Sequence, residues 1–329
     1  MEYLYKISNN IFSGNIDVFT TLVELEDTHN EADEICFDLR GLKDLNPFNM
    51  MLIARKINQF KSKFPNRQYT FIRKDTDDYL GHMGFYDAMG ANKYGKKMGE
   101  ARGSATYIPI HSIDFSSMYF YNDIEPLSQK LAAVLKFDSD LADFIQYAFI
   151  ESIRNVYEHS CSNKAFVCAQ RWPSHNLVEI AVLDEGCGIA HAMKKRYPEL
   201  SEKALLNLSL NPGISAMSNH RYLGRNDQWS NSGYGLYILK ELCKAYGGSF
   251  IICSNNYGMH YHNGKRTTYE TSFSGTAVSL RFLTNQNINF VQERKRILYE
   301  GQEIAKKYKN AITKASKSSG GHYGKSDEW

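Results

Sequence analysis

The stretch Glu151-Ser-Ile-Arg-Asn155-Val-Tyr-Glu158-His159 lies in an apolar-rich part of the chain that we expect to be a long helix. Its polar residues recur at three- and four-residue steps and therefore share one face of that helix. A polar face between apolar flanks must point at something polar. The Asn155 amide oxygen suits Mg²⁺, which prefers oxygen ligands, and the Glu151 carboxylate, one turn earlier, could polarise a water or a hydroxyl. Taken alone, the pattern more often marks a solvated helix side.

A second segment, Asp184-Glu-Gly186-Cys-Gly188, follows a β-branched run at residues 177–183 that predicts a strand. Its two glycines permit positive φ angles and a close approach to the backbone. Asp184, at the end of the strand, could accept a hydrogen bond from an exocyclic amine such as that of adenine. The segment is therefore a candidate contact for the base of a nucleotide.

Two further segments complete the series. Ser232-Gly233-Tyr-Gly235-Leu236 leads into a helical pattern at residues 236–246, which two glycines end. Free amides at a helix N-terminus favour phosphate, although Gly-x-Gly alone usually marks a turn. Ser274-Gly275-Thr276 opens a strand pattern at residues 277–282, where the small Thr276 hydroxyl could reach the edge of a base. In this order, the four segments together indicate an ATP site.

The four segments resemble those of the GHKL ATPase superfamily, which includes DNA gyrase, the heat-shock chaperone ATPases, histidine kinases and the MutL mismatch-repair proteins. The resemblance covers about residues 125–285. Asn-x-x-Glu-His looks most like the anti-sigma-factor serine kinases, and Gly-Tyr-Gly-Leu-Tyr-Ile-Leu-Lys like histidine kinases. The resemblance implies a two-layer α/β sandwich that binds ATP and Mg²⁺, with Glu151 as general base, Asn155 on Mg²⁺ and Asp184 on the adenine amine. It also implies Gly186 and Gly188 beside the base, Gly233, Gly235 and Leu236 at the phosphates, and Thr276 near the adenine.

The sequence departs from this family pattern in three places. Cys187 replaces the more usual Pro or other residue of the second segment, which we expect to be harmless because only the glycines need special backbone angles. Residues 189–231 form a longer stretch that we expect to be an ATP lid, with Arg225 as the first candidate for a phosphate contact. Other basic candidates in the lid are Lys194, Lys195, Arg196, His220 and Arg221. Residues 123–150 contain no His, so autophosphorylation on histidine is not expected.

The N-terminal third predicts a small α/β unit of its own. Residues 35–39 and 68–72 are strand patterns, residues 47–63 and 77–88 are helical ones, and this alternation implies parallel strand pairing. Asp38-Leu-Arg-Gly-Leu42, followed by a short loop and a helix, resembles STAS domains over about residues 1–90. The loop lacks the Ser or Thr that STAS antagonists phosphorylate, so we expect a regulatory or binding platform. The alternative is a generic α/β unit whose likeness is accidental.

We therefore predict an α/β protein in three parts: a STAS-like regulatory domain (residues 1–105), a GHKL ATP-binding domain (106–285) and a helical and flexible tail (286–329), with residues 90–106 as a linker. The tail begins with a basic amphipathic helix pattern, for which docking on protein is the default role. A second copy of the chain and nucleic acid are the alternative partners. Residues 254–272 are polar, and we expect them to form a loop.

Composition limits the other possibilities. A chain of 329 residues suggests about two domains, and its net charge of +3 is too small to demand nucleic acid or membrane. The six cysteines show no Cys-x-x-Cys spacing and indicate reduced thiols. No apolar run approaches the roughly 20 residues that cross a bilayer, and the N-terminal residues lack a signal-peptide pattern. We therefore expect a cytoplasmic protein.

Two functional hypotheses remain open. In the first, ATP and Mg²⁺ close the lid, and the chain acts on a protein partner as an ATPase or serine-kinase-like phosphotransferase, with Glu151 orienting the acceptor. In the second, the chain is a non-catalytic ATP sensor whose nucleotide state sets homodimerisation or partner affinity. A nucleic-acid-dependent ATPase of the gyrase or MutL type is less favoured, because those proteins add a transducer domain and only about 45 residues follow here.

Overall fold

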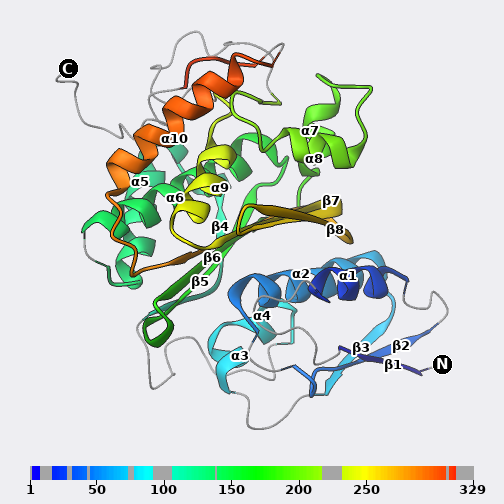
Figure 1. Cartoon of the computed structure of the whole chain (residues 1–329). Helices are drawn as coiled ribbons and strands as arrows, with labels where there is room; N and C mark the ends of the chain where they lie inside the picture. Colours follow the sequence, from blue (N-terminus) through cyan, green and yellow to red (C-terminus); the bar gives the residue numbers. More distant parts are fainter. Residues whose placement is uncertain are drawn as a thin grey trace.

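The computed structural model describes residues 2–7, 17–27, 32–42, 45–72, 78–91, 106–137, 139–216, 232–308 and 311–315. These residues form a mixed α/β fold with a parallel three-stranded sheet and an antiparallel five-stranded sheet (Figure 1). The elements lie in four layers: a helical layer, the five-stranded sheet, two helices of the N-terminal part, and the three-stranded sheet.

The N-terminal part contains the parallel sheet, with strand order β1-β2-β3. Its elements are β1 (Glu2–Lys6), α1 (Asp17–Asp27), β2 (Glu34–Asp38), α2 (Pro47–Lys63), β3 (Gln68–Ile72), α3 (Asp78–His82) and α4 (Phe85–Ala88). The parallel pairing, the helix at residues 47–63 and the strand at residues 68–72 are confirmed. A single helix over residues 77–88 is wrong, because the chain turns at Gly84, whose φ of 73° cannot continue a helix.

Local capping residues set the start of helix α2. Asn46 caps the helix by accepting a hydrogen bond from the Asn49 amide at 2.8 Å, and Pro47 occupies the first helical position. Lysines follow in the last turn, where they complement the helix dipole. The middle of the helix is buried almost all round because α2 lies between the two sheets.

The larger sheet has the strand order β4-β5-β6-β8-β7. Its strands are β4 (Tyr107–Asp114), β5 (Lys164–Trp172), β6 (Leu177–Asp184), β7 (Ser249–His262) and β8 (Lys265–Leu283). The strand patterns at residues 177–183 and 277–282 are therefore confirmed. The expected polar loop at residues 254–272 is wrong, because β7 and β8 form a long hairpin there. Asn263 and Gly264 make its turn, both with positive φ.

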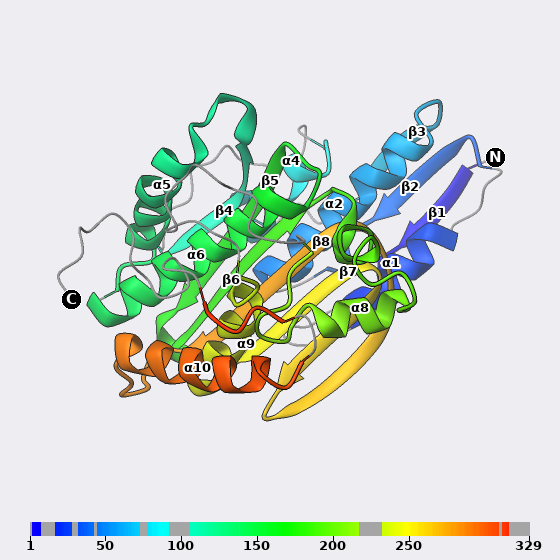
Figure 2. The same ribbon diagram turned by 90° about the horizontal axis from the view of Figure 1, so that it is seen from above.

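One face of this sheet is covered by helices α5 (Phe120–Val134), α6 (Ser139–His159), α9 (Gly235–Ala245) and α10 (Phe290–Ala305), as Figure 2 shows from above. The predicted C-terminal helix is confirmed as α10. It packs on α6 and α9 and buries Phe290 and Ile297, so this part of its apolar face is used within the chain. Residues 316–329, the end of the predicted flexible tail, lie outside the described ranges.

The opposite face of the sheet packs against α1 and α2. Along β6 the side chains alternate between two cores: Val178, Ile180 and Val182 join the helical side, whereas Ala181 and Leu183 join the N-terminal part. Burial on both faces explains why β6 is apolar apart from the buried Glu179 and the terminal Asp184. The linker residues 92–105 lie outside the described ranges, so the division at residue 105 stays a prediction. Within the described ranges, no helix has both the length and the apolar sequence needed to cross a bilayer.

Candidate functional site

A pocket with about 870 Å³ of empty space, part of it open to solvent, lies between α6, the end of β6, the neighbouring part of β8 at Thr276, and the start of α9. All four of the predicted segments contribute to its lining. Seven of the predicted site residues line it: Asn155, Asp184, Gly188, Gly233, Gly235, Leu236 and Thr276. Glu151 and Gly186 do not. The structure therefore brings together most of a residue set that is spread over more than a hundred positions of sequence.

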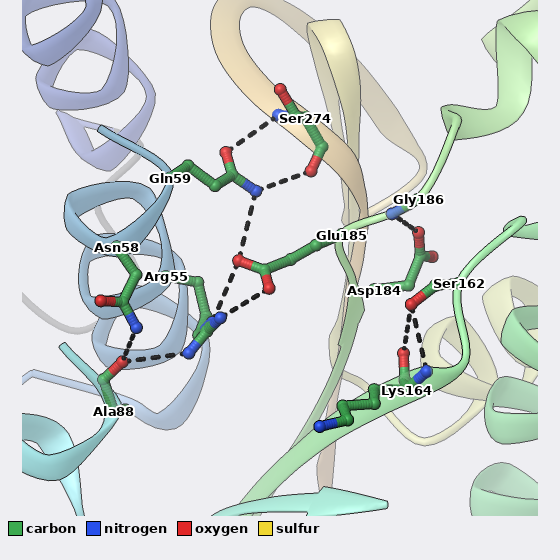
Figure 3. Close-up of polar contacts among 10 residues, drawn as sticks. All are labelled: Arg55, Asn58, Gln59, Ala88, Ser162, Lys164, Asp184, Glu185, Gly186 and Ser274. Carbon is green, nitrogen blue, oxygen red and sulfur yellow. Dashed lines mark hydrogen bonds and ion pairs between the residues drawn. The ribbon is translucent and has the colours of Figure 1, made fainter. Parts of the chain in front are cut away.

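Asp184 forms one end of the pocket. It ends β6 opposite Thr276 of β8, and only 3% of its surface is exposed. The backbone amides of Gly186, at 2.9 Å (Figure 3), and of Thr276 both donate to its carboxylate. Burial nevertheless raises the pKa of Asp184 to about 7, because desolvation of the charged form outweighs these two bonds. Asp184 is thus a buried acceptor whose charge changes near neutral pH.

Gly186 does not line the pocket but packs against the chain at the end of α6. A Cβ atom on Gly186 would clash with the Ser160 carbonyl, which accepts a hydrogen bond from the Cys187 amide at 2.6 Å. The second segment therefore lies directly against the C-terminal end of α6, and only glycine permits that approach.

The start of α9 forms the other end of the pocket. A Cβ atom on Gly235 would clash with the Glu151 carboxylate and lie 3.8 Å from Asn155 Nδ2, so glycine lets α9 begin directly beside α6. Asn155 Nδ2 is buried and has no hydrogen-bond partner among the described residues. An amide in that position is suited to a ligand placed between α6 and the first turn of α9.

Glu151 does not line the pocket. Its Oε2 atom lies 2.9 Å from Arg154 Nη2, and both side chains are almost completely buried. Arg154 Nε also lies 3.8 Å from Glu158 Oε1. Unlike Glu151, Arg154 lines the pocket. The predicted general base is therefore absent from the pocket lining and paired with a cation that does line the pocket.

His159 also lines the pocket, near the second segment. Burial, followed by the charge of Arg154, lowers the pKa of His159 to about 4. The imidazole is consequently neutral at physiological pH, and it contributes hydrogen-bonding nitrogens rather than positive charge.

The predicted lid supplies the apolar side of the pocket. Helix α7 (Gly188–Lys194) and the loop that follows α8 (Glu202–Leu208) contribute Ile189, Met193 and Ile214. The described basic residues of the lid do not line the pocket: Lys194 donates to the Leu200 carbonyl, Arg196 donates to the Ser215 carbonyl, and Lys195 is exposed. His220, Arg221 and Arg225 lie outside the described residues.

Sequence reasoning assigned no role to several lining residues. Arg154 had a usable signal, since a cation three positions after Glu151 falls on the same helical face. His159 was placed on the polar face without a function. Ile214, Ser215 and Ala216 reach the pocket through the fold of a loop, and no local pattern marks them.

The pocket thus has a buried acceptor and a hydroxyl at one end, a helix N-terminus at the other, and α6 running between them. Such an arrangement can bind an elongated ligand that carries a hydrogen-bond donor at one end and negative charge at the other. A scan against protein-family models matches none of them, and a search of curated proteins finds no significant match.

Proposed function

We propose that this chain binds ATP together with Mg²⁺ in the pocket and acts as a GHKL-type nucleotide switch on a partner protein, with a STAS-like N-terminal part. The observation that carries the proposal is the convergence of four distant segments on one pocket with an acceptor end and a helix N-terminus. A nucleotide has the matching polarity, with an amine on the base and negative charge on the phosphates.

Each end of the pocket supports a specific contact. Asp184 and Thr276 would hold the adenine, with the Asp184 carboxylate accepting from the exocyclic amine. The backbone amides of the first turn of α9, which begins at Gly235 directly after Gly233 and Tyr234, would hold the phosphates. Asn155, which lines the pocket between these two ends, would hold Mg²⁺ through its amide oxygen. When bound, Mg²⁺ neutralises phosphate charge.

The position of Glu151 favours a second candidate, a sensor that binds ATP without turning it over. A general base must reach the proton that it accepts, whereas Glu151 is buried, paired with Arg154 and absent from the pocket lining. Nucleotide binding, by contrast, is compatible with a buried Glu151 that stays paired with Arg154. Turnover would need the Glu151 carboxylate to leave Arg154.

Calorimetric titration of ATP, with and without Mg²⁺, tests the proposal on wild type and on Asn155→Ala. We expect wild type to bind ATP more tightly with Mg²⁺, and Asn155→Ala to retain the Mg²⁺-independent part of the affinity only. Glu158→Gln, on the same helix but outside the pocket lining, is the matched control. The absence of ATP binding by wild type under both conditions would overturn the proposal.

A further inference from the structure

Helix α2 of the N-terminal part contacts two segments at the acceptor end of the pocket: the loop that follows β6, at Glu185, and the stretch of β8 at Ser274 (Figure 3). Arg55 and Gln59 stand four positions apart on α2 and therefore share one face of it. Arg55 forms an ion pair with Glu185, the residue directly after Asp184. Gln59 forms hydrogen bonds with the backbone of Ser274, two residues before Thr276.

The Arg55 contact is a two-bond ion pair. Nε lies 3.1 Å from Glu185 Oε1, and Nη2 lies 2.6 Å from Oε2. Two further contacts fix the guanidinium: Nη1 donates to the Ala88 carbonyl at 3.1 Å, and the guanidinium carbon lies 4.2 Å from the centre of the Phe166 ring. Only 16% of the Arg55 side chain and 24% of the Glu185 side chain are exposed. A paired, fixed and mostly buried guanidinium positions its partner more firmly than a surface ion pair does.

The Gln59 contact resembles the pairing of one strand with another. Its amide nitrogen donates to the Ser274 carbonyl at 2.7 Å, and its amide oxygen accepts from the Ser274 amide at 3.2 Å. The same nitrogen lies 3.4 Å from Glu185 Oε1. The Gln59 side chain therefore contacts both the Glu185 loop and the Ser274 segment of β8.

The two segments lead into neighbouring positions of the sheet, because Asp184 of β6 pairs with Thr276 of β8, and a Cβ atom on Gly275 would clash with the Asp184 carbonyl. Displacement of either segment therefore changes the spacing between the Asp184 carboxylate and Thr276. We propose that Arg55 and Gln59 are positioning residues of the nucleotide site, through which the N-terminal part sets base affinity and senses whether the site is filled. This inference rests on the proposed function.

Arg55 also affects the electrostatic environment of Asp184. Burial is the main cause of the raised pKa of Asp184, and the negative charge of Glu185 raises it further. Arg55 is the cation that pairs with Glu185. Among the residues that the structure describes, the other titratable or charged groups around Asp184 are Cys187 in its own loop and Arg154 and His159 on α6. The pKa of Cys187 is raised to about 12 and that of His159 is lowered to about 4, so of these described groups Asp184 is the one that titrates between pH 5 and 9. The pocket residues from α7, α9 and β8 carry no ionisable side chain.

Titration of ADP with Mg²⁺ into the full chain tests the proposal. We expect Gln59→Ala and Arg55→Gln each to weaken binding roughly tenfold at pH 7.5, within the usual range of coupling between sites. Asn58→Ala is the matched control. It removes a 2.8 Å hydrogen bond from the same helix to the Ala88 carbonyl and leaves the contacts with Glu185 and Ser274 in place. It should bind within about twofold of wild type.

The pH dependence separates positioning from a general loss of structure. Arg55→Gln leaves the Glu185 charge unpaired, so the pH at which binding reaches half its maximum should rise, and Arg55→Lys should return it toward the wild-type value. Gln59→Ala should lower affinity without moving that midpoint. Comparison of variants at each pH cancels the protonation of ADP itself.

Wild-type affinity in both Gln59→Ala and Arg55→Gln would overturn this inference, as would an equal loss in Asn58→Ala. If wild type binds no nucleotide, the proposed function fails and the inference fails with it, which is a distinguishable result. If Arg55→Gln does not fold, Gln59→Ala, which removes only bonds of a neutral side chain, decides the question.

Discussion

Glu151 and Arg154 form a buried ion pair within α6, with Oε2 and Nη2 2.9 Å apart and at most 2% of either side chain exposed. Glu151 is the residue that the sequence marks as a general base, yet it is paired with Arg154 and absent from the pocket lining. Under the proposed function, this pair distinguishes a site that only binds nucleotide from one that also turns it over.

Glu151→Gln tests turnover directly. If Glu151 orients the attacking water or hydroxyl, the variant should release phosphate at least about a hundredfold more slowly while binding ATP with similar affinity. Glu158→Gln, which also removes a carboxylate near Arg154, is the control and should keep the wild-type rate. Absence of phosphate release by wild type would favour the sensor, and equal, measurable release by wild type and Glu151→Gln would rule out Glu151 as the general base.

Arg154→Met should destabilise the protein by about 3–5 kcal/mol, because it removes the cation that is paired with the buried Glu151 carboxylate. Urea unfolding measures this loss. Arg296→Met, which breaks exposed pairs with Glu293 and Glu300, should cost about 1 kcal/mol or less. The double variant Glu151→Gln/Arg154→Met should recover part of the loss. Similar costs for Arg154→Met and Arg296→Met would contradict the importance of the buried pair.

Asp184→Asn should stabilise the nucleotide-free protein at neutral and alkaline pH. The pKa of Asp184 is about 7 in the folded chain against an ordinary value of 3.8, so its contribution to stability is full below pH 4 and is lost as pH rises through 7. The complete loss amounts to at most about 4 kcal/mol for a shift of this size. The difference in Tm between the variant and wild type should therefore grow from pH 4 to pH 8. A difference that does not change with pH would contradict the assignment.

Tyr234→Phe should loosen the segment that follows α10. The buried Tyr234 donates its hydroxyl to the Ile312 carbonyl at 2.9 Å, and the Ile312 amide donates to the Gly213 carbonyl at 2.8 Å. Loss of the first bond should cost about 1 kcal/mol and speed amide hydrogen exchange at residues 311–315. Tyr246→Phe, which removes a 3.4 Å bond to the Ile288 carbonyl, should leave exchange at residues 311–315 unchanged. Unchanged exchange in Tyr234→Phe would refute this role.

Local sequence patterns predict the elements that carry the site. The helix at residues 47–63 and the strand at residues 68–72 have their predicted ends, because Asn46 and Pro47 fix the helix start and β-branched and aromatic residues fill the strand. The strand that ends at Asp184 and the helix that follows Gly235 were also predicted to within one residue. Periodicity and capping act over a few residues, so sequence reports them well.

The contacts that complete the site are not local. Arg55 and Glu185 are 130 positions apart, and nothing near either residue indicates the other. Polar composition also concealed the β7–β8 hairpin, because pairing across strands stabilises it despite few apolar residues near its turn. Arg154 is the exception, since its spacing from Glu151 already indicated a pair.

The central claim is that an adenine nucleotide binds between Asp184 and the start of α9. The most direct test is calorimetric titration of ATP with Mg²⁺ into wild type, Asp184→Ala and Asp114→Ala. Asp114 is a matched control because it also ends a strand and accepts a hydrogen bond from a nearby backbone amide, but it lies outside the pocket lining. We predict binding to wild type and Asp114→Ala, and at least a tenfold weaker affinity for Asp184→Ala. Undiminished binding by Asp184→Ala, or none by wild type, would contradict the claim.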